Sequence, residues 1–176
     1  MITIDGGTGT ILHNGVKFNK ESEKMIDQWR LSDHVTLGTS EADVTTNWKR
    51  NDSTGYEKIG TGMSESSGIF TFPQTGIYLI ELVATAYGSS GASLFTTVRV
   101  KTRKGGGDYA DRLQVSEQSY ANIAYGSIAG SVVFDVEDVS GDNLKMAALA
   151  GTSGTKLLGA PSIQRTGLTF IRIGDT

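Results

Sequence analysis

The chain has 176 residues, the length of one ordinary domain with room for a short appendage. Its 23 glycines and few runs of helix-favouring residues favour an all-β fold with many turns. The absence of cysteine excludes disulfides and thiolate metal sites, and the net charge of −3 gives no reason to expect nucleic-acid binding.

The first 18 residues are expected to form two or three short strands. Ile2 and Ile4 alternate with polar residues, and Asn14-Gly15 is a hairpin signal. A ribbon this small is marginal alone in water, so we expect it to dock on the body of the protein or on a partner. The opening lacks the pattern of a secretory signal and no apolar run reaches membrane-spanning length, so we expect a soluble protein without membrane contact.

We expect a short helix from Asn19, as its cap, through Asp27, with Met25 and Ile26 on its apolar side. We therefore divide the chain into an N-terminal attachment arm, residues 1–27, and a main domain, residues 28–176.

From Gln28 the apolar residues recur with a period of two, which is typical of strands. Regular short strands separated by glycine-bearing turns predict a sandwich or jelly roll. The expected strands cover residues 28–37, 45–50, 58–63, 67–72, 76–87, 94–103, 112–118, 127–137, 144–149 and 166–173.

Three of these segments, residues 77–87, 128–134 and 168–173, are largely apolar at both alternating sets of positions. Both faces of these strands are therefore expected to be shielded from water. One face enters the sandwich core, and the other is covered either by a neighbouring subunit or by local loops.

The central segment carries the pattern Gly68-x-Phe70-x-x-Pro73-x-x-Gly76-x-Tyr78. This pattern resembles the signature of the ten-stranded jelly roll shared by the complement first-component globular head and the tumour necrosis factor superfamily. Further similar features are Trp48, the apolar strand and acidic turn of residues 133–142, and Thr166-Gly167-Leu168. The resemblance implies a non-enzymatic protein that binds its partners as a trimer.

The same resemblance implies that residues 28–37, 76–87, 127–137 and 166–173 form an inner sheet around a three-fold axis. The apolar residues assigned to the trimer interface or the inner sheet are Trp29, Leu31, Tyr78, Ile80, Leu82, Val132, Phe134, Leu168 and Phe170.

A second resemblance concerns the opening segment, residues 2–11, which is similar to openings common in structural proteins of tailed bacteriophages. Trp48 together with residues 58–70 also resembles jelly-roll modules of phage virions. The resemblance implies a capsid decoration or cement protein, assembled in the host cytoplasm and located on the virion, with the major capsid protein as partner. The alternative is a head or tail fibre module that contacts a host glycan or protein. Residues expected to attach to the capsid are Ile2, Ile4, Ile11, Leu12, Val16 and Phe18.

Catalytic and metal chemistry find little support. The only histidines, His13 and His34, fall in an expected hairpin and strand, and no nucleophile motif accompanies them. Four acidic residues, Asp135, Glu137, Asp138 and Asp142, invite a calcium hypothesis, but they fit no calcium-loop spacing and match an exposed strand end. We expect no cofactor and no metal.

Two surface clusters complete the candidates. One is a basic strand end, made of Arg99, Lys101, Arg103 and Lys104, which we interpret as a solvated hairpin tip. The other consists of Tyr109, Tyr120 and Tyr125, which offer a carbohydrate or receptor contact or else close the ends of the sandwich.

Overall fold

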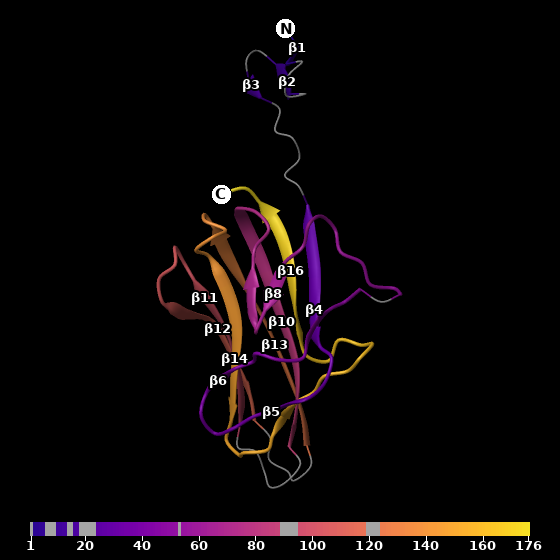
Figure 1. Ribbon diagram of the computed structural model, residues 1–176, viewed down its shortest axis with the longest axis vertical. Helices are drawn as coiled ribbons and strands as arrows, with labels where there is room; N and C mark the ends of the chain where they lie inside the picture. The colour runs from indigo at the N-terminus through magenta and orange to yellow at the C-terminus, as the bar shows by residue number, and fades with distance from the viewer. Residues whose placement is uncertain are drawn as a thin grey trace.

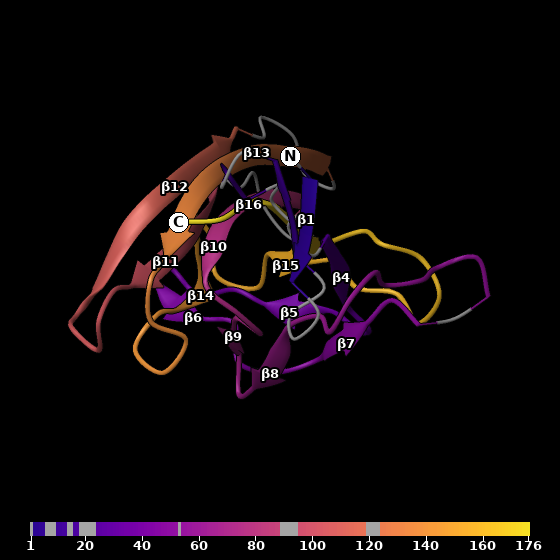
Figure 2. The same ribbon diagram turned by 90° about the horizontal axis from the view of Figure 1, so that it is seen from above.

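A computed structural model describes residues 24–52, 54–88, 95–118 and 124–176, together with the backbone of three strands nearer the N-terminus. Throughout these residues the regular structure is β-strand, without a helix. The strands of the main domain form two facing antiparallel sheets (Figures 1 and 2). The predicted all-β class is confirmed.

The N-terminal strands pair with one another in a three-stranded antiparallel sheet. They are β1 (Ile2–Asp5), β2 (Thr10–His13) and β3 (Val16–Lys17), in the order β1-β2-β3. This confirms the expectation of two or three short strands. The proposed turn residues Asn14 and Gly15 lie between β2 and β3, outside the described residues.

The first sheet of the main domain, called the inner sheet below, is built around the 13-residue strand β10. Strand β13 pairs with one edge of β10, and β16, β4 and β7 follow in order from the other edge. Its strands are β4 (Met25–Leu31), β5 (Val35–Thr36), β7 (Trp48–Arg50), β10 (Gly76–Gly88), β13 (Ala124–Val136), β15 (Lys156–Leu157) and β16 (Gly167–Gly174). The four segments expected to share one sheet therefore do so.

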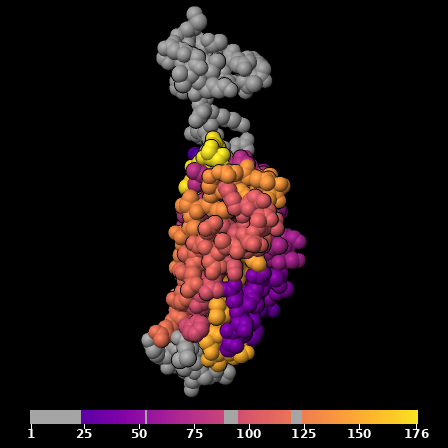
Figure 3. Space-filling view, turned by 90° about the vertical axis from the view of Figure 1, so that its left-hand side faces the viewer, coloured from indigo at the N-terminus to yellow at the C-terminus, as the bar shows by residue number. Residues whose placement is uncertain are grey.

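The second sheet, called the outer sheet, has the order β12-β11-β14-β9-β8, and β6 pairs with β14. Its strands are β6 (Ala42–Asp43), β8 (Ser64–Ser66), β9 (Ile69–Thr71), β11 (Thr96–Arg103), β12 (Tyr109–Glu117) and β14 (Asn143–Ala150). Figure 3 shows a side of the sandwich where residues of β12–β14, coloured salmon to orange, form much of the surface. Without the two-residue strands β5, β6 and β15, the described residues contribute five strands to each sheet, which gives the predicted ten-stranded jelly roll.

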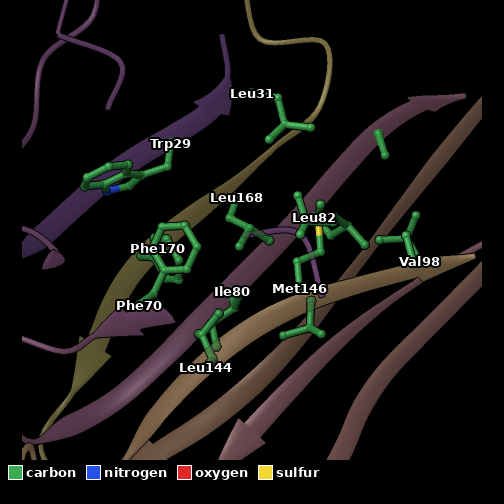
Figure 4. Packing of buried hydrophobic residues seen from close by; sticks show 14 of the residues in the cluster. Trp29, Leu31, Phe70, Ile80, Leu82, Val98, Leu144, Met146, Leu168 and Phe170 are labelled. Atoms are coloured by element: carbon green, nitrogen blue, oxygen red, sulfur yellow. The ribbon is translucent and has the colours of Figure 1, made fainter. Parts of the chain in front are cut away.

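The core lies between the two sheets (Figure 4). Side chains of β4, β10 and β16 meet those of β9, β11 and β14 there, because alternate residues of each strand point inward. Phe70 occupies the centre of an aromatic cluster, with its ring centroid 5.5 Å from that of Trp29, 5.0 Å from Trp48 and 5.3 Å from Phe170. Burial of these large side chains supplies much of the driving force for folding.

Two glycines of the signature pattern are required by the backbone. Gly68 has φ +82°, and a Cβ there would lie 2.4 Å from the carbonyl oxygen of Val44. Gly76 has φ +140°, and a Cβ would lie 2.4 Å from Nε of Arg172. Only glycine tolerates both this backbone conformation and this close approach, which explains two of the fixed positions in the pattern.

Three local expectations are wrong. Residues 25–27 belong to β4, not to a helix, because Met25 and Asp27 continue the alternating burial of the strand. Residues 58–63 form no strand beyond an isolated bridge at Ile59; the strand β8 begins at Ser64. The segment 28–37 is interrupted between β4 and β5, which places His34 in a connection.

Candidate self-association surface

Strand β10 presents two different faces. Tyr78, Ile80 and Leu82 are buried between the sheets, with at most 1% of their surface exposed. The alternate residues Leu79, Glu81 and Val83 lie on the opposite face, which no other sheet of the described chain covers. The face of the inner sheet that points away from the core is called the association face below.

An aliphatic row crosses the association face from one edge to the other. Its members occupy directly opposed positions on five neighbouring segments: Val133, Leu79, Ile171, Ile26 and Ile59. With strands about 4.8 Å apart, the row is about 19 Å long. Val133 is 56% exposed and Ile59 50%, so the outer members of the row face solvent in a single chain.

A polar row lies next to the aliphatic row. It consists of Ser131, Glu81, Thr169 and Gln28, again at opposed positions on β13, β10, β16 and β4. Nε2 of Gln28 donates a hydrogen bond to Oγ1 of Thr169 at 3.3 Å. The next row contains the small residues Ala129 and Gly167 beside Val83. Glu81, Val83, Ala129, Ser131 and Thr169 contribute to a hollow of about 370 Å³ in the face.

An aromatic pair marks the far end of the association face. Tyr87 on β10 and Tyr125 on β13 are directly opposed, with ring centroids 4.9 Å apart. Tyr125 is 70% exposed, a high value for so large a ring. Tyrosine combines apolar area with a hydroxyl group, a combination enriched in protein interfaces.

The residues assigned from sequence to the trimer interface or the inner sheet all lie on inner-sheet strands, but their side chains point into the core. Eight of them are buried, and Val132 packs against the same core cluster: Trp29, Leu31, Tyr78, Ile80, Leu82, Phe134, Leu168 and Phe170. The exposed face is formed by the other parity of the same strands. The doubly apolar strands are evident in the sequence, but which of their two faces enters the core is not.

The residues assigned to capsid attachment lie mostly on the N-terminal sheet. Ile2 and Ile4 belong to β1, Ile11 and Leu12 to β2, and Val16 to β3. Phe18 lies outside the described residues. Their role in attachment stays a prediction.

The acidic turn after β13 is held together by backbone hydrogen bonds and an ion pair. The buried carboxylate of Asp142 accepts hydrogen bonds from the backbone N–H groups of Gly105, Glu137 and Asp138 at 2.6, 2.9 and 3.2 Å. Lys104 Nζ lies 3.6 Å from the same carboxylate. Among the described residues no histidine and acidic side chains gather into a group that could hold a metal ion.

The pKa of Asp142 reflects two opposing influences. Burial raises the pKa, whereas the three backbone hydrogen bonds and Lys104 lower it and prevail, so the pKa lies below its ordinary value. The carboxylate is therefore a structural anchor that ties the β11–β12 turn to the end of β13.

The basic strand end is largely neutralised by neighbouring carboxylates. Lys101 Nζ lies 2.5 Å from Oε1 of Glu41 and 3.4 Å from Oδ1 of Asp111, and Arg99 pairs with the same two acidic residues. Lys104 pairs with Glu137 at 3.2 Å. Such exposed pairs contribute little to stability, and they leave no strongly basic patch for an acidic partner.

The remaining candidates are dispersed. Nδ1 of His34 accepts a 3.1 Å hydrogen bond from the backbone N–H of Gly159, while His13 lies on β2. Tyr109 lies on the outer sheet, with Lys145 Nζ 4.1 Å from its ring centroid. It is thus on a different sheet from Tyr125, and Tyr120 lies outside the described residues. No helix in the described ranges is long and apolar enough to cross a membrane.

The two sheets and their strand order define a jelly-roll sandwich of the tumour necrosis factor type. Solved structures with this fold include murine APRIL at pH 5.0, with a TM-score of 0.63 and 18% sequence identity over 85% of this chain and 99% of that chain. Murine APRIL at pH 8.5 gives a TM-score of 0.61 and 17% identity with the same coverage. Eiger TNF from S. frugiperda gives a TM-score of 0.65 and 14% identity over 88% of this chain and 96% of that chain.

Comparison with protein-family models and with curated proteins gives no match. The likeness to the solved structures therefore establishes the fold.

Proposed function

We propose that this chain is a non-enzymatic structural protein of a tailed-bacteriophage virion, which forms homotrimers and decorates the capsid. The trimer forms through the association face, and the N-terminal strands bind the major capsid protein. The protein is assembled in the host cytoplasm and is located on the capsid surface of the virion. The aliphatic row carries the self-association part of this proposal, because an apolar stripe that is partly exposed along its length and most exposed at Val133 and Ile59 marks a surface that another chain covers.

A second copy of this chain is the occupant that the fold favours. The sequence resembles a jelly-roll family whose members bind partners as trimers, and the solved structures with this fold support that resemblance. A stable interface buries roughly 800 Å² per partner. The association face extends from the aliphatic row to the pair Tyr87–Tyr125, which suits a contact of that extent better than a small ligand.

The virion location is supported by the sequence. The opening residues resemble those of tailed-phage structural proteins, and β1–β3 pair with one another in a sheet of their own. A small sheet of this kind has edges to which strands of another protein can be added. This arrangement suits attachment by residues 1–18 and self-association by the jelly roll.

The trimer is tested by light scattering on the purified full chain. The expected mass is that of three 18.7-kDa chains. Val133→Asp places a charge in the aliphatic row and is expected to give the mass of one chain with an unchanged circular dichroism spectrum. Val139→Asp is the matched control, because Val139 is also exposed, at 37%, but lies in the turn after β13, off the association face. A single-chain mass for the wild-type protein would refute self-association.

The capsid role is tested by deleting residues 1–18 and mixing the shortened chain with capsids that lack this protein. We expect loss of capsid binding with the trimer mass retained. Binding by the shortened chain would contradict the assigned role of the N-terminal strands. Copy number per virion distinguishes a decoration protein from a fibre module. A decoration protein covers the shell in many copies, whereas a fibre tip is present in few copies.

A further inference from the structure

The association face carries one charged side chain near its centre, Glu81 on β10. Its direct neighbours are the hydroxyl residues Ser131 on β13 and Thr169 on β16. The aliphatic row lies on one side of it, and Val83 with Ala129 and Gly167 on the other. Within the described part of the chain, the carboxylate of Glu81 makes no hydrogen bond or ion pair.

Other charged groups of the same face are remote or already engaged. Arg30 on β4 is 1% exposed, and its guanidinium donates hydrogen bonds to Ala160 O, Arg50 O and Asn51 Oδ1 at 3.3, 3.0 and 2.6 Å and also to Pro161 O. Asp135 lies opposite Ile77, towards the end of β13. Lys49 lies opposite Arg30 on the edge strand β7, and Lys156 lies opposite Tyr87, so both are distant from Glu81 along the sheet. The carboxylate of Glu81 is thus satisfied by water in the single chain and requires either water or a donor from another copy after association.

The two rows make different demands on an assembly. Contacts between aliphatic side chains are non-directional, so the aliphatic row alone permits several offsets and rotations between two sheets. A carboxylate buried without a donor is strongly unfavourable. Any arrangement that covers Glu81 with an apolar surface is therefore disfavoured, and single buried polar groups are known to select register and oligomeric state in this way.

We infer that Glu81 is a specificity-determining residue, which restricts self-association to the arrangement that keeps its carboxylate solvated or hydrogen-bonded. This inference rests on the proposed function, because it concerns the same face. Contacts of the aliphatic row hold the chains together, and Glu81 selects how they are arranged.

The test compares the full-length wild-type chain with Glu81→Leu by light scattering coupled to size exclusion. We expect a single three-chain mass for the wild type and a broad distribution extending beyond three chains for Glu81→Leu. Asp108→Leu is the control, since Asp108 is also exposed but lies in the connection between β11 and β12 of the outer sheet; we expect it to keep the single mass. Circular dichroism checks that each variant is folded.

Glu81→Val repeats the test with a residue that strands favour, in case leucine disturbs folding. A single three-chain mass in whichever apolar variant folds would overturn the inference. A single-chain mass for both wild type and variants would instead refute the proposed trimer, so the two failures are distinguishable.

Discussion

The indole Nε1 of Trp29 donates a 3.0 Å hydrogen bond to Oδ2 of Asp27, two residues earlier on the same face of β4. The same carboxylate, which is fully buried, accepts hydrogen bonds from the backbone N–H of Met63 at 2.8 Å and from Nε of Arg50 at 3.0 Å. The guanidinium carbon of Arg50 lies 4.6 Å from the centroid of a Trp29 ring. One carboxylate therefore fixes an indole, β7 and the start of the β8 segment against β4.

Replacing Asp27 with alanine is expected to destabilise the protein strongly. The substitution leaves two N–H donors and the Arg50 guanidinium without their acceptor, and breaking a buried pair in this way costs about 3–5 kcal/mol. Urea denaturation followed by tryptophan fluorescence measures the free energy of unfolding. Asp52→Ala is the control, because Asp52 is exposed in the connection between β7 and β8. It should change this free energy by less than about 0.5 kcal/mol. Equal losses in the two variants would contradict the role given to Asp27.

Adjacent positions on β10 are expected to respond in opposite ways to a charge. Leu82 is 1% exposed in the core, so Leu82→Asp should lower the free energy of unfolding by about 4 kcal/mol or more. Val83 is 39% exposed on the association face, so Val83→Asp should keep the folded circular dichroism spectrum and lose only the self-association proposed above. A folded Leu82→Asp protein with unchanged melting would show that the assignment of the two faces is wrong.

This difference between neighbours shows where sequence reasoning stops. A strand that is apolar at every position, such as residues 77–80, predicts that both faces are shielded but does not show which one meets the other sheet. Packing against the outer sheet decides this, and such packing is a long-range property. The strands and the jelly roll were predictable because turn glycines and alternation are local signals. The parity of the candidate interface was not.

The errors have similar causes. The expected helix over 19–27 relied on a cap and two apolar residues, but Asp27 is buried by Trp29, Arg50 and Met63, which come from the strand itself and from distant segments. Tertiary hydrogen bonds thus outweigh local propensity at the start of β4. The sequence contains one signal of this network, because Asp27 is a charged residue among the apolar residues Met25, Ile26 and Trp29.

Arg30 is a second buried charge whose replacement is expected to be costly. Its guanidinium bridges the Arg50–Asn51 segment and the Ala160–Pro161 segment through carbonyl and amide oxygens. Lysine cannot reproduce this planar set of donors. Arg30→Lys should therefore lower the free energy of unfolding by about 1–3 kcal/mol, measured by urea denaturation. Lys49→Arg, at the exposed neighbour that pairs with Arg30 across β4 and β7, should leave it unchanged within about 0.5 kcal/mol.

Acid should weaken the fold through Asp142. Burial raises the pKa of its carboxyl group, but hydrogen bonds from Gly105, Glu137 and Asp138 together with Lys104 prevail, so the pKa in the folded protein is below the ordinary value of 3.8. The folded state therefore binds this proton less tightly than the unfolded state. The resulting stability is fully present above the unfolded pKa and is lost as pH falls from about 4 through the folded pKa.

The measurement is urea denaturation of wild type and Asp142→Asn at a series of pH values between about 6 and 3. The wild-type free energy of unfolding should be steady at the upper end and decrease below about pH 4. Asp142→Asn should be less stable near neutrality, because the amide cannot accept all three backbone hydrogen bonds as well as a carboxylate, and its decrease below about pH 4 should be shallower. Parallel curves for the two proteins would assign the acid sensitivity to other carboxylates and remove Asp142 as its source.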